Sequence, residues 1–139
     1  QLVTMLDADL KVRDGADHDF YNQFNTITHI RNAIVAYKDD IPAACGAFKE
    51  FSADTAEIKR MYVKPEYRGQ GIANIILDEL EKWADELQYK TCVLETGKKQ
   101  PEAIRLYEKS GYTRIHNYGQ YANVENSVCM RKDIQHQLQ

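Results

Sequence analysis

Apolar residues at the start of the chain recur every four positions. Leu2, Leu6 and Leu10 share this spacing, and Val3 stands beside the first of them. Because side chains four residues apart lie on one face of an α-helix, the spacing predicts an amphipathic helix that ends before Gly15. The polar and aromatic residues 16–31 predict a short helix or an ordered loop.

Three short apolar segments follow, and turn-forming residues separate them. They cover residues 33–37, 43–51 and 55–63, with Pro42 in the first gap and residues 52–54 in the second. Short apolar segments bounded by such residues are typical of strands. We therefore predict an antiparallel meander of three strands, which Pro65 ends.

The second half of the chain alternates helical and strand patterns. A spacing of three or four residues predicts a long amphipathic helix from Ile72 to Leu87. A β-branched run at 91–95 predicts a buried strand, and a second helix runs from Pro101 to a stop at Gly111. Two last strands are expected at residues 112–116 and 127–131. This order predicts a mixed α/β domain of the α+β type, with helices on both faces of one sheet.

Length and composition fit one domain that spans residues 1–139. The chain has 18 Lys and Arg against 21 Asp and Glu, a net charge of −3. This mild acidity argues against binding of nucleic acid through a basic surface, so we predict no nucleic-acid partner. No apolar run in the sequence reaches the ~20 residues that cross a bilayer, and no secretory signal pattern is present. We expect no membrane association and a cytoplasmic location.

The cysteines and histidines predict no metal site and no disulfide. Cys45, Cys92 and Cys129 stand far apart without a CxxC pair, which is typical of reduced, buried thiols. Three histidines lack a partner at metal-binding spacing and receive no role: His29, His116 and His136.

The most informative stretch is Arg68-Gly69-Gln70-Gly71-Ile72-Ala73, between a predicted strand and the predicted long helix. The first N–H groups of a helix are unpaired within it and carry partial positive charge, and glycines allow a phosphate to approach the backbone. The stretch therefore predicts a pyrophosphate cradle. The alternative is a plain strand-to-helix turn that needs glycine for a positive φ.

This R-x-x-G-x-A pattern resembles motif A of the GNAT superfamily of acetyl-CoA-dependent N-acetyltransferases. Three segments occur in the family's order: EIKRMYVKPEYRGQGIA, LET and PEAIRLYEKSGY. The resemblance covers residues 33–132, whereas residues 1–32 match only in general type. It implies a GNAT-like, mostly antiparallel central sheet with helices on both faces and a splayed strand pair that binds acetyl-CoA. We expect the family's first strand to be missing or clipped, and the natural start to lie upstream of Gln1.

The resemblance implies an acetyl-CoA site in three parts. Backbone groups of Met61 and Val63 would hold the pantetheine arm and polarise the acetyl carbonyl. Gln100 stands where the family often carries an asparagine, and Lys98 and Lys99 beside it either add favourable charge near the phosphates or form a solvated pair. Backbone amides would hold the pyrophosphate along the cradle, at Arg68, Gly69, Gln70, Gly71, Ile72, Ala73 and Asn74.

Two catalytic residues follow from the same resemblance. Tyr107 matches the tyrosine whose hydroxyl protonates the departing CoA thiolate, and its alternative role is that of a core aromatic residue. Glu57 lies eleven residues before Arg68, where some members place a general base. A base is needed because an ammonium must lose a proton before it attacks a thioester. The alternative for Glu57 is a solvated strand end.

We predict an N-acetyltransferase that moves an acetyl group from acetyl-CoA to a primary amine, by direct attack and without a covalent acyl-enzyme. A small-molecule acceptor is expected to lie between segments 17–25 and 117–126, whose candidate contacts are His18, Tyr21, Tyr118 and Tyr121. Alternatives are a protein (lysine or N-terminal) acetyltransferase, a non-catalytic acyl-CoA sensor, and an α/β domain with an unrelated ligand. A homodimer through the last strands or an exposed sheet edge is a further prediction.

Overall fold

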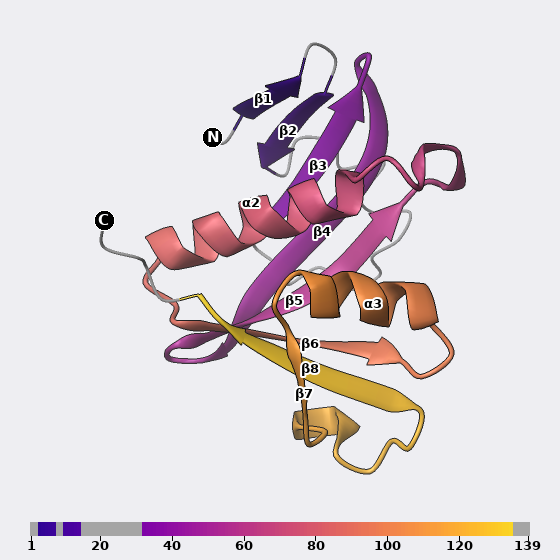
Figure 1. Cartoon of the computed structure of the whole chain (residues 1–139). Coiled ribbons are helices and arrows are strands. Elements are labelled where there is room, and N and C mark those ends of the chain that lie inside the picture. The colour runs from indigo at the N-terminus through magenta and orange to yellow at the C-terminus, as the bar shows by residue number, and fades with distance from the viewer. Residues whose placement is uncertain (1–2, 8–9, 15–31, 135–139) are drawn as a thin grey trace. The chain divides into compact units, whose positions relative to one another are not determined.

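The computed structural model describes residues 3–7, 10–14 and 32–134 (Figure 1). Contacts divide the chain into two units: Gln1–Lys49 with Lys59–Lys82, and Glu50–Ile58 with Trp83–Gln139. Below they are called the first and second unit. That residues 1–139 form one domain stays a prediction.

The first unit contains strands in the order β1-β2-β3-β4-β5. Their bounds are β1 Val3–Asp7, β2 Leu10–Asp14, β3 Asn32–Lys38, β4 Ile41–Ser52 and β5 Thr55–Val63. The pairs β1–β2, β2–β3 and β3–β4 are antiparallel. Figure 1 shows the short β1–β2 hairpin beside β3. The three predicted strands at 33–37, 43–51 and 55–63 are thus confirmed.

The predicted N-terminal helix is wrong, because β1 and β2 occupy its residues. A spacing of four residues also keeps side chains on one face of a strand, where the period is two, so Leu2, Leu6 and Leu10 fit both structures. Pairing decides between them: Leu10 lies opposite Lys38 of β3. Strands therefore precede β3, although the sequence predicted none there. The prediction for residues 16–31 lies outside the described residues.

Helix α2 (Ile72–Glu86) packs against one face of the first unit's strands. A Cβ placed on Gly46 of β4 would lie 2.7 Å from Met61 Sδ, 2.8 Å from Ile76 Cγ2 and 3.1 Å from Leu80 Cδ1. Glycine at position 46 therefore lets the helix approach the strand closely. The predicted long helix is confirmed to within one residue at its end.

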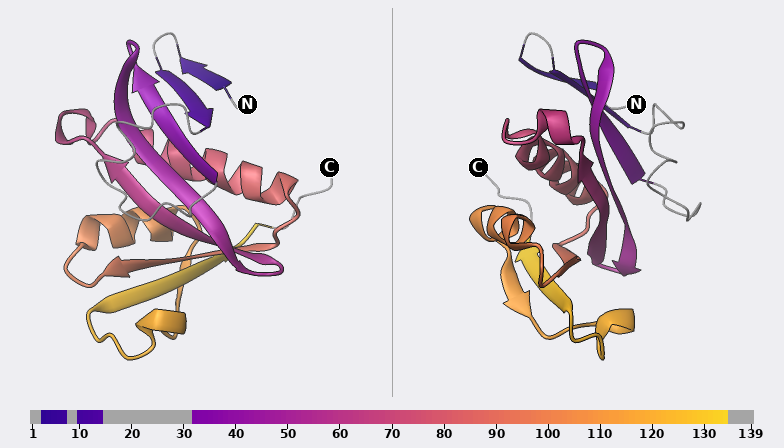
Figure 2. Two further views of the ribbon diagram at one scale, coloured as in Figure 1. Left: turned by 180° about the vertical axis from the view of Figure 1, so that it is seen from behind. Right: turned by 90° about the vertical axis from the view of Figure 1, so that its right-hand side faces the viewer.

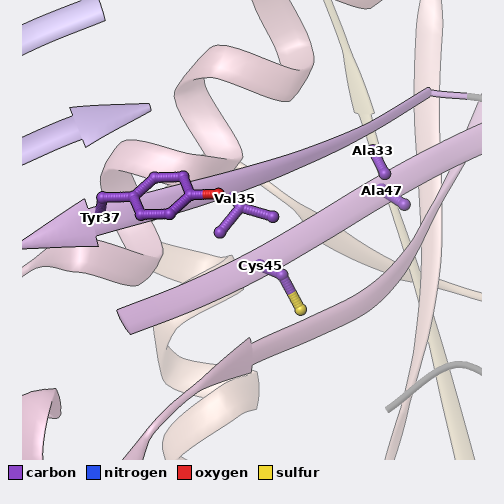
Figure 3. Packing of buried hydrophobic residues seen from close by; sticks show 5 residues of the cluster. All are labelled: Ala33, Val35, Tyr37, Cys45 and Ala47. Atoms are coloured by element: carbon purple, nitrogen blue, oxygen red, sulfur yellow. The ribbon is translucent and has the colours of Figure 1, made fainter. Parts of the chain in front are cut away.

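The opposite face of β3 and β4 is also buried. It holds a hydrophobic cluster of Ala33, Val35, Tyr37, Cys45 and Ala47 (Figure 3). Tyr62 packs against this cluster. Val35 lies opposite Cys45, and Ala33 lies opposite Ala47. Burial raises the pKa of the Cys45 thiol to about 12, so this cysteine is a protonated core residue.

The second unit has the strand order β5-β6-β8-β7. Strand β6 (Thr91–Gly97) runs parallel to β5 over Thr55–Glu57, whereas β8 (Ser127–Asp133) is antiparallel to both β6 and β7 (Thr113–Ile115). Helix α3 (Pro101–Lys109) lies along one side of these strands (Figure 2). Pro101 is in its first turn and Gly111 follows its end with φ +100°, as predicted. The splay of β5 from β6 stays a prediction.

Register assigns side chains of the second unit to two faces, since neighbours across a ladder point the same way. One face is apolar and includes Ala56, Leu94 and Met130. The other, called the polar face below, carries Thr55 and Glu57 of β5, Thr91, Val93 and Glu95 of β6, Thr113 and Ile115 of β7, and Ser127, Cys129, Arg131 and Asp133 of β8.

Candidate active site

The predicted cradle lies in the first unit between β5 and α2. A short 3₁₀ helix, η1 (Pro65–Tyr67), follows β5, and Gly69 and Gly71 then adopt φ +78° and +80°. A Cβ on either glycine would meet no atom within 4 Å. Glycine is needed here for the left-handed backbone, which costs other residues about 1–2 kcal/mol, and not for lack of space.

The start of α2 is suited to an anion. Residues 68–71 are exposed, and the first turn of this 15-residue helix contains no acidic side chain. The first N–H groups of a helix lack partners within it, and its dipole favours negative charge there. The Arg68 side chain folds back, because its Nε donates to the Val63 carbonyl oxygen at 2.8 Å and its guanidinium lies 5.6 Å from the centroid of the Tyr62 ring.

Met61 and Val63 stand at the end of β5, as predicted, and both are half-buried. Met61 is near Gly46, on the face that α2 covers. The Val63 carbonyl already accepts the hydrogen bond from Arg68. The predicted contacts of these two backbones with pantetheine stay predictions.

Glu57 is buried in the polar face of the second unit and is only 3% exposed. It is therefore not the solvated strand end that the sequence left open. The Tyr118 hydroxyl donates a hydrogen bond to Glu57 Oε2 at 2.8 Å. Burial, followed by the charge and hydrogen bond of Glu57, raises the pKa of Tyr118 far above its ordinary value, so this phenol stays protonated.

The Tyr118 ring is held by two other aromatic rings. Phe51 lies edge-on at 5.0 Å between ring centroids, and Tyr121 lies edge-on at 5.7 Å. Tyr121 belongs to the 3₁₀ helix η2 (Gly119–Tyr121). The predicted acceptor residues Tyr118 and Tyr121 are thus neighbours, and Tyr118 contacts the predicted base. His18 and Tyr21 lie outside the described residues.

Tyr107 is buried in α3 of the second unit, at 7% exposure. Its ring meets the Tyr112 ring edge-on, with centroids 5.9 Å apart. Burial raises the pKa of Tyr107 to about 12. The hydroxyl has no hydrogen-bond partner among the residues that the structure describes. The side chain is thus a core aromatic residue with a protonated hydroxyl, and its predicted role as general acid stays a prediction.

Gln100 is the N-cap residue of α3, and its side chain makes no capping hydrogen bond. Its backbone N–H donates to the Gly97 carbonyl at 3.0 Å, and its carbonyl accepts from the Ile104 N–H at 3.1 Å. The amide side chain is exposed, as are Lys98 and Lys99. Their predicted roles toward the cofactor stay predictions.

Comparison with known families identifies the chain. The model of the acetyltransferase (GNAT) family matches residues 3–112. The chain belongs to this family. It is an N-acetyltransferase, as the R-x-x-G-x-A pattern predicted.

Individual proteins agree with this assignment. The acetyltransferase is 32% identical to the uncharacterized N-acetyltransferase YsnE of Bacillus subtilis, over 71% of this chain and 67% of that protein. It is 31% identical to the IAA acetyltransferase of Azospirillum brasilense, over 73% and 67% of the two chains. A crystal structure assigned as an acyl-CoA N-acyltransferase from Klebsiella pneumoniae superposes with a TM-score of 0.79 at 26% identity, over 90% of this chain and 97% of the other. The predicted GNAT-like fold, with a mixed and mostly antiparallel sheet, is confirmed.

The polar face of the acetyltransferase has three residues, Glu95, Ser127 and Cys129, to which the sequence assigned no role in the site. The Ser127 hydroxyl donates to Glu95 Oε2 at 2.7 Å. Burial raises the pKa of the Cys129 thiol, the nearby charges of Glu95 and Glu57 raise it further, and the Tyr118 backbone N–H opposes them. Side chains alternate between the two faces of a strand, so Ser127 and Cys129 of β8 lie on the same face. This alternation is the sequence signal that could have grouped the two residues.

All three cysteines of the acetyltransferase are buried, as predicted, and none of them is in a disulfide bond. In the described residues, no group of three or more His, Cys, Asp and Glu side chains is arranged to hold a metal ion. No helix among them combines the length and apolar character needed to span a bilayer.

Proposed function

We propose that this acetyltransferase acetylates the primary amine of a small molecule, with Glu57 as general base and Tyr107 as general acid. Acetyl-CoA supplies the acetyl group as an activated thioester. The IAA acetyltransferase of Azospirillum brasilense, named for a small molecule, supports this class of acceptor. The cradle at Arg68–Asn74 is the proposed pyrophosphate site, since its exposed helix start carries no acidic residue in the first turn.

The burial of Glu57 and its hydrogen bond from Tyr118 are the observation that carries the proposal. A carboxylate that is 3% exposed loses most of its hydration, which is unfavourable unless hydrogen bonds replace it. Tyr118 supplies one such bond through a neutral hydroxyl. A neutral hydroxyl does not neutralise the carboxylate to which it donates. Such a carboxylate can still accept a proton from an ammonium group.

Proton transfers accompany each change of bonds in the reaction. Glu57 takes a proton from the ammonium, and the free amine nitrogen forms a bond to the acetyl carbonyl carbon. The carbon–sulfur bond then breaks with its electron pair on sulfur, and the Tyr107 hydroxyl donates a proton to that sulfur. The nitrogen loses its second proton to water as the amide forms, Glu57 returns its proton to water, and Tyr107 regains a proton from water, so that one proton is released in all. Because burial raises the pKa of Tyr107 to about 12, it holds its proton throughout the neutral range, and positioning must supply the driving force for its donation.

The test compares Glu57→Gln with Glu79→Gln. Glu79 is a similarly buried carboxylate, 5% exposed, that pairs with Lys82 at 3.5 Å in α2. CoA release is measured with an amine identified by screening, and acetyl-CoA affinity is measured by calorimetry. We expect Glu57→Gln to lower kcat/KM by about 10²–10⁴-fold, the usual contribution of a general base, while acetyl-CoA affinity stays within about twofold.

Two outcomes would contradict the proposal. Equal losses in the two variants would remove Glu57 from the chemistry. Binding of acetyl-CoA without acetylation of any amine would leave only an acyl-CoA-binding module.

A further inference from the structure

A cavity of about 340 Å³ opens on the polar face of the second unit. This volume is within the range of small-molecule sites, which begins at about 300 Å³. All the residues that line the cavity belong to the second unit. Phe51, Val93 and Ile115 supply apolar walls, and Thr55, Thr91 and Arg131 supply polar groups.

The cavity adjoins the proposed base. Tyr118, whose hydroxyl donates to Glu57, forms part of its wall. Glu57 lies opposite Val93, and Val93 lies opposite Arg131, so the three form one row across β5, β6 and β8. Neighbouring strands are about 4.8 Å apart, which places the backbones of Glu57 and Arg131 about 10 Å from each other. Arg131 lines the cavity, and Glu57 is 3% exposed and outside the lining, so a short ligand that contacts Arg131 can extend toward Glu57.

The two ends of this row differ in charge. Glu57 supplies a carboxylate at one end, and Arg131 supplies a guanidinium at the other. Arg131 Nη2 contacts Asp133 Oδ1 at 2.8 Å, and both side chains are about half exposed or more. Such an exposed pair is weak, because water screens the two charges. Arginine has five N–H donors, so a ligand carboxylate can bind the groups that Asp133 leaves free or replace Asp133.

The acidic residue that lines the cavity, Asp54, takes part in a turn. Asp54 Oδ1 accepts hydrogen bonds from the hydroxyls of Ser52 at 3.4 Å and Thr55 at 3.1 Å. The Asp54 carbonyl accepts from the N–H groups of Lys90 and Thr91. Asp54 therefore closes the β4–β5 turn, and the groups that hold its carboxylate belong to the same turn.

We infer that this cavity binds the acceptor and that the acceptor is a small amine carrying a carboxylate, of the class of free amino acids. The amine lies toward Glu57 and the carboxylate binds Arg131. This inference rests on the proposed function and specifies its substrate class. A binding site whose charged side chain pairs with a charged group of the ligand discriminates against an analogue without that group. The analogue leaves the side chain of the site without its partner.

The experiment compares each of the twenty common amino acids with its amide as acceptor. CoA release gives kcat/KM, and mass spectrometry identifies the N-acetyl product. We expect at least one amino acid to be acetylated with kcat/KM about tenfold above that of its amide, the effect of one charge-assisted contact. Arg131→Gln should lower kcat/KM for the acid about tenfold and leave that of the amide within about twofold.

Two further variants separate recognition from folding. Arg114→Gln removes an exposed arginine of β7 that lies opposite Met130, on the apolar face, and should leave the ratio of acid to amide unchanged. Asp133→Asn removes the carboxylate that competes for Arg131, so it should lower KM for the acid and leave KM for the amide unchanged. A general structural disturbance would not improve the affinity for one acceptor alone.

Preference for the amides, or equal losses for acid and amide in Arg131→Gln, would overturn the inference. The same panel includes spermidine and a tripeptide amide with a free N-terminus. If either is acetylated and no amino acid is, the inference fails but the proposed function stands. If acetyl-CoA binds and no amine reacts, the proposed function fails as well.

Discussion

Removing the Tyr118 hydroxyl should destabilise the protein strongly for so small a change. Tyr118→Phe deletes one oxygen and keeps the ring contacts with Phe51 and Tyr121, at 5.0 and 5.7 Å. The lost hydrogen bond to Glu57 is 2.8 Å long and joins a carboxylate that is 3% exposed. Hydrogen bonds to charged groups contribute about 1.5–3 kcal/mol. We therefore expect the free energy of unfolding to fall by about 2 kcal/mol.

Urea unfolding measures this loss, and a second tyrosine provides the control. With an m-value of about 2 kcal/mol/M, the midpoint should shift down by about 1 M. The Tyr89 hydroxyl donates to Glu50 at 2.9 Å in an exposed pair. Tyr89→Phe makes the same chemical change where water replaces the lost partner, so it should cost less than about 1 kcal/mol.

A double-mutant cycle with Glu57→Gln attributes the loss to the pair. Glutamine keeps a neutral acceptor oxygen, so the coupling energy reports mainly the charged part of the interaction. We expect coupling of about 1–2 kcal/mol, within the range for residues in direct contact. Coupling below about 0.5 kcal/mol, or equal losses in Tyr118→Phe and Tyr89→Phe, would refute the argument from burial.

Three other substitutions test separate features. Gly46→Ala places a Cβ within 2.8 Å of Met61 and Ile76, so the free energy of unfolding in urea should fall by about 1–3 kcal/mol. The control Gly97→Ala has ordinary contacts from 3.6 Å and should be nearly neutral. Equal effects of the two substitutions would contradict the close packing of α2. Gly71→Ala, at φ +80°, should cost about 1–2 kcal/mol of stability and weaken acetyl-CoA binding in calorimetry; unchanged affinity would argue against the cradle. Burial raises the pKa of Tyr107 from an ordinary 10 to about 12, so between these pH values the folded state keeps a proton that the unfolded state loses. The free energy of unfolding should therefore fall as the pH rises from 10 to 12, by about 3 kcal/mol in all. Tyr107→Phe should remove this decline of stability with pH, and it should lower turnover while leaving acetyl-CoA affinity nearly unchanged. If the stability of Tyr107→Phe depended on pH as that of the unchanged protein does, the phenol would be in a solvated site.

Periodicity predicted the elements best where only one structure fits the spacing. The mixture of four- and three-residue steps in α2 cannot continue along one face of a strand, and the helix begins at Ile72, within one residue of the start predicted near Gly71. Leu2, Leu6 and Leu10 fit a helix and a strand equally, so the choice depended on pairing with β3. Such pairing joins residues far apart in the chain, and local spacing carries no information about it.

Only those parts of the candidate site that belong to a local sequence motif could be predicted from the sequence. The left-handed Gly69 and Gly71 follow from their place between a strand and a helix. Sixty-one positions separate Tyr118 from Glu57, so their hydrogen bond has no local signal. The sequence named both residues but assigned them to different roles, and only the fold brings them together.

Hydrogen-bond donors of the polar face stabilise two of its three carboxylates, those of Glu57 and Glu95. Glu57 and Glu95 each accept a hydrogen bond from a neutral hydroxyl, of Tyr118 and of Ser127. A buried lysine or arginine would bind more strongly, but it would also compete with a substrate ammonium for the same oxygens. Hydroxyl donors replace part of the lost hydration without neutralising the charge. The arginine of this face, Arg131, instead pairs with the exposed Asp133 at 2.8 Å. The acceptor that we propose, with an amine at one end and a carboxylate at the other, would place its amine toward Glu57 and its carboxylate toward Arg131.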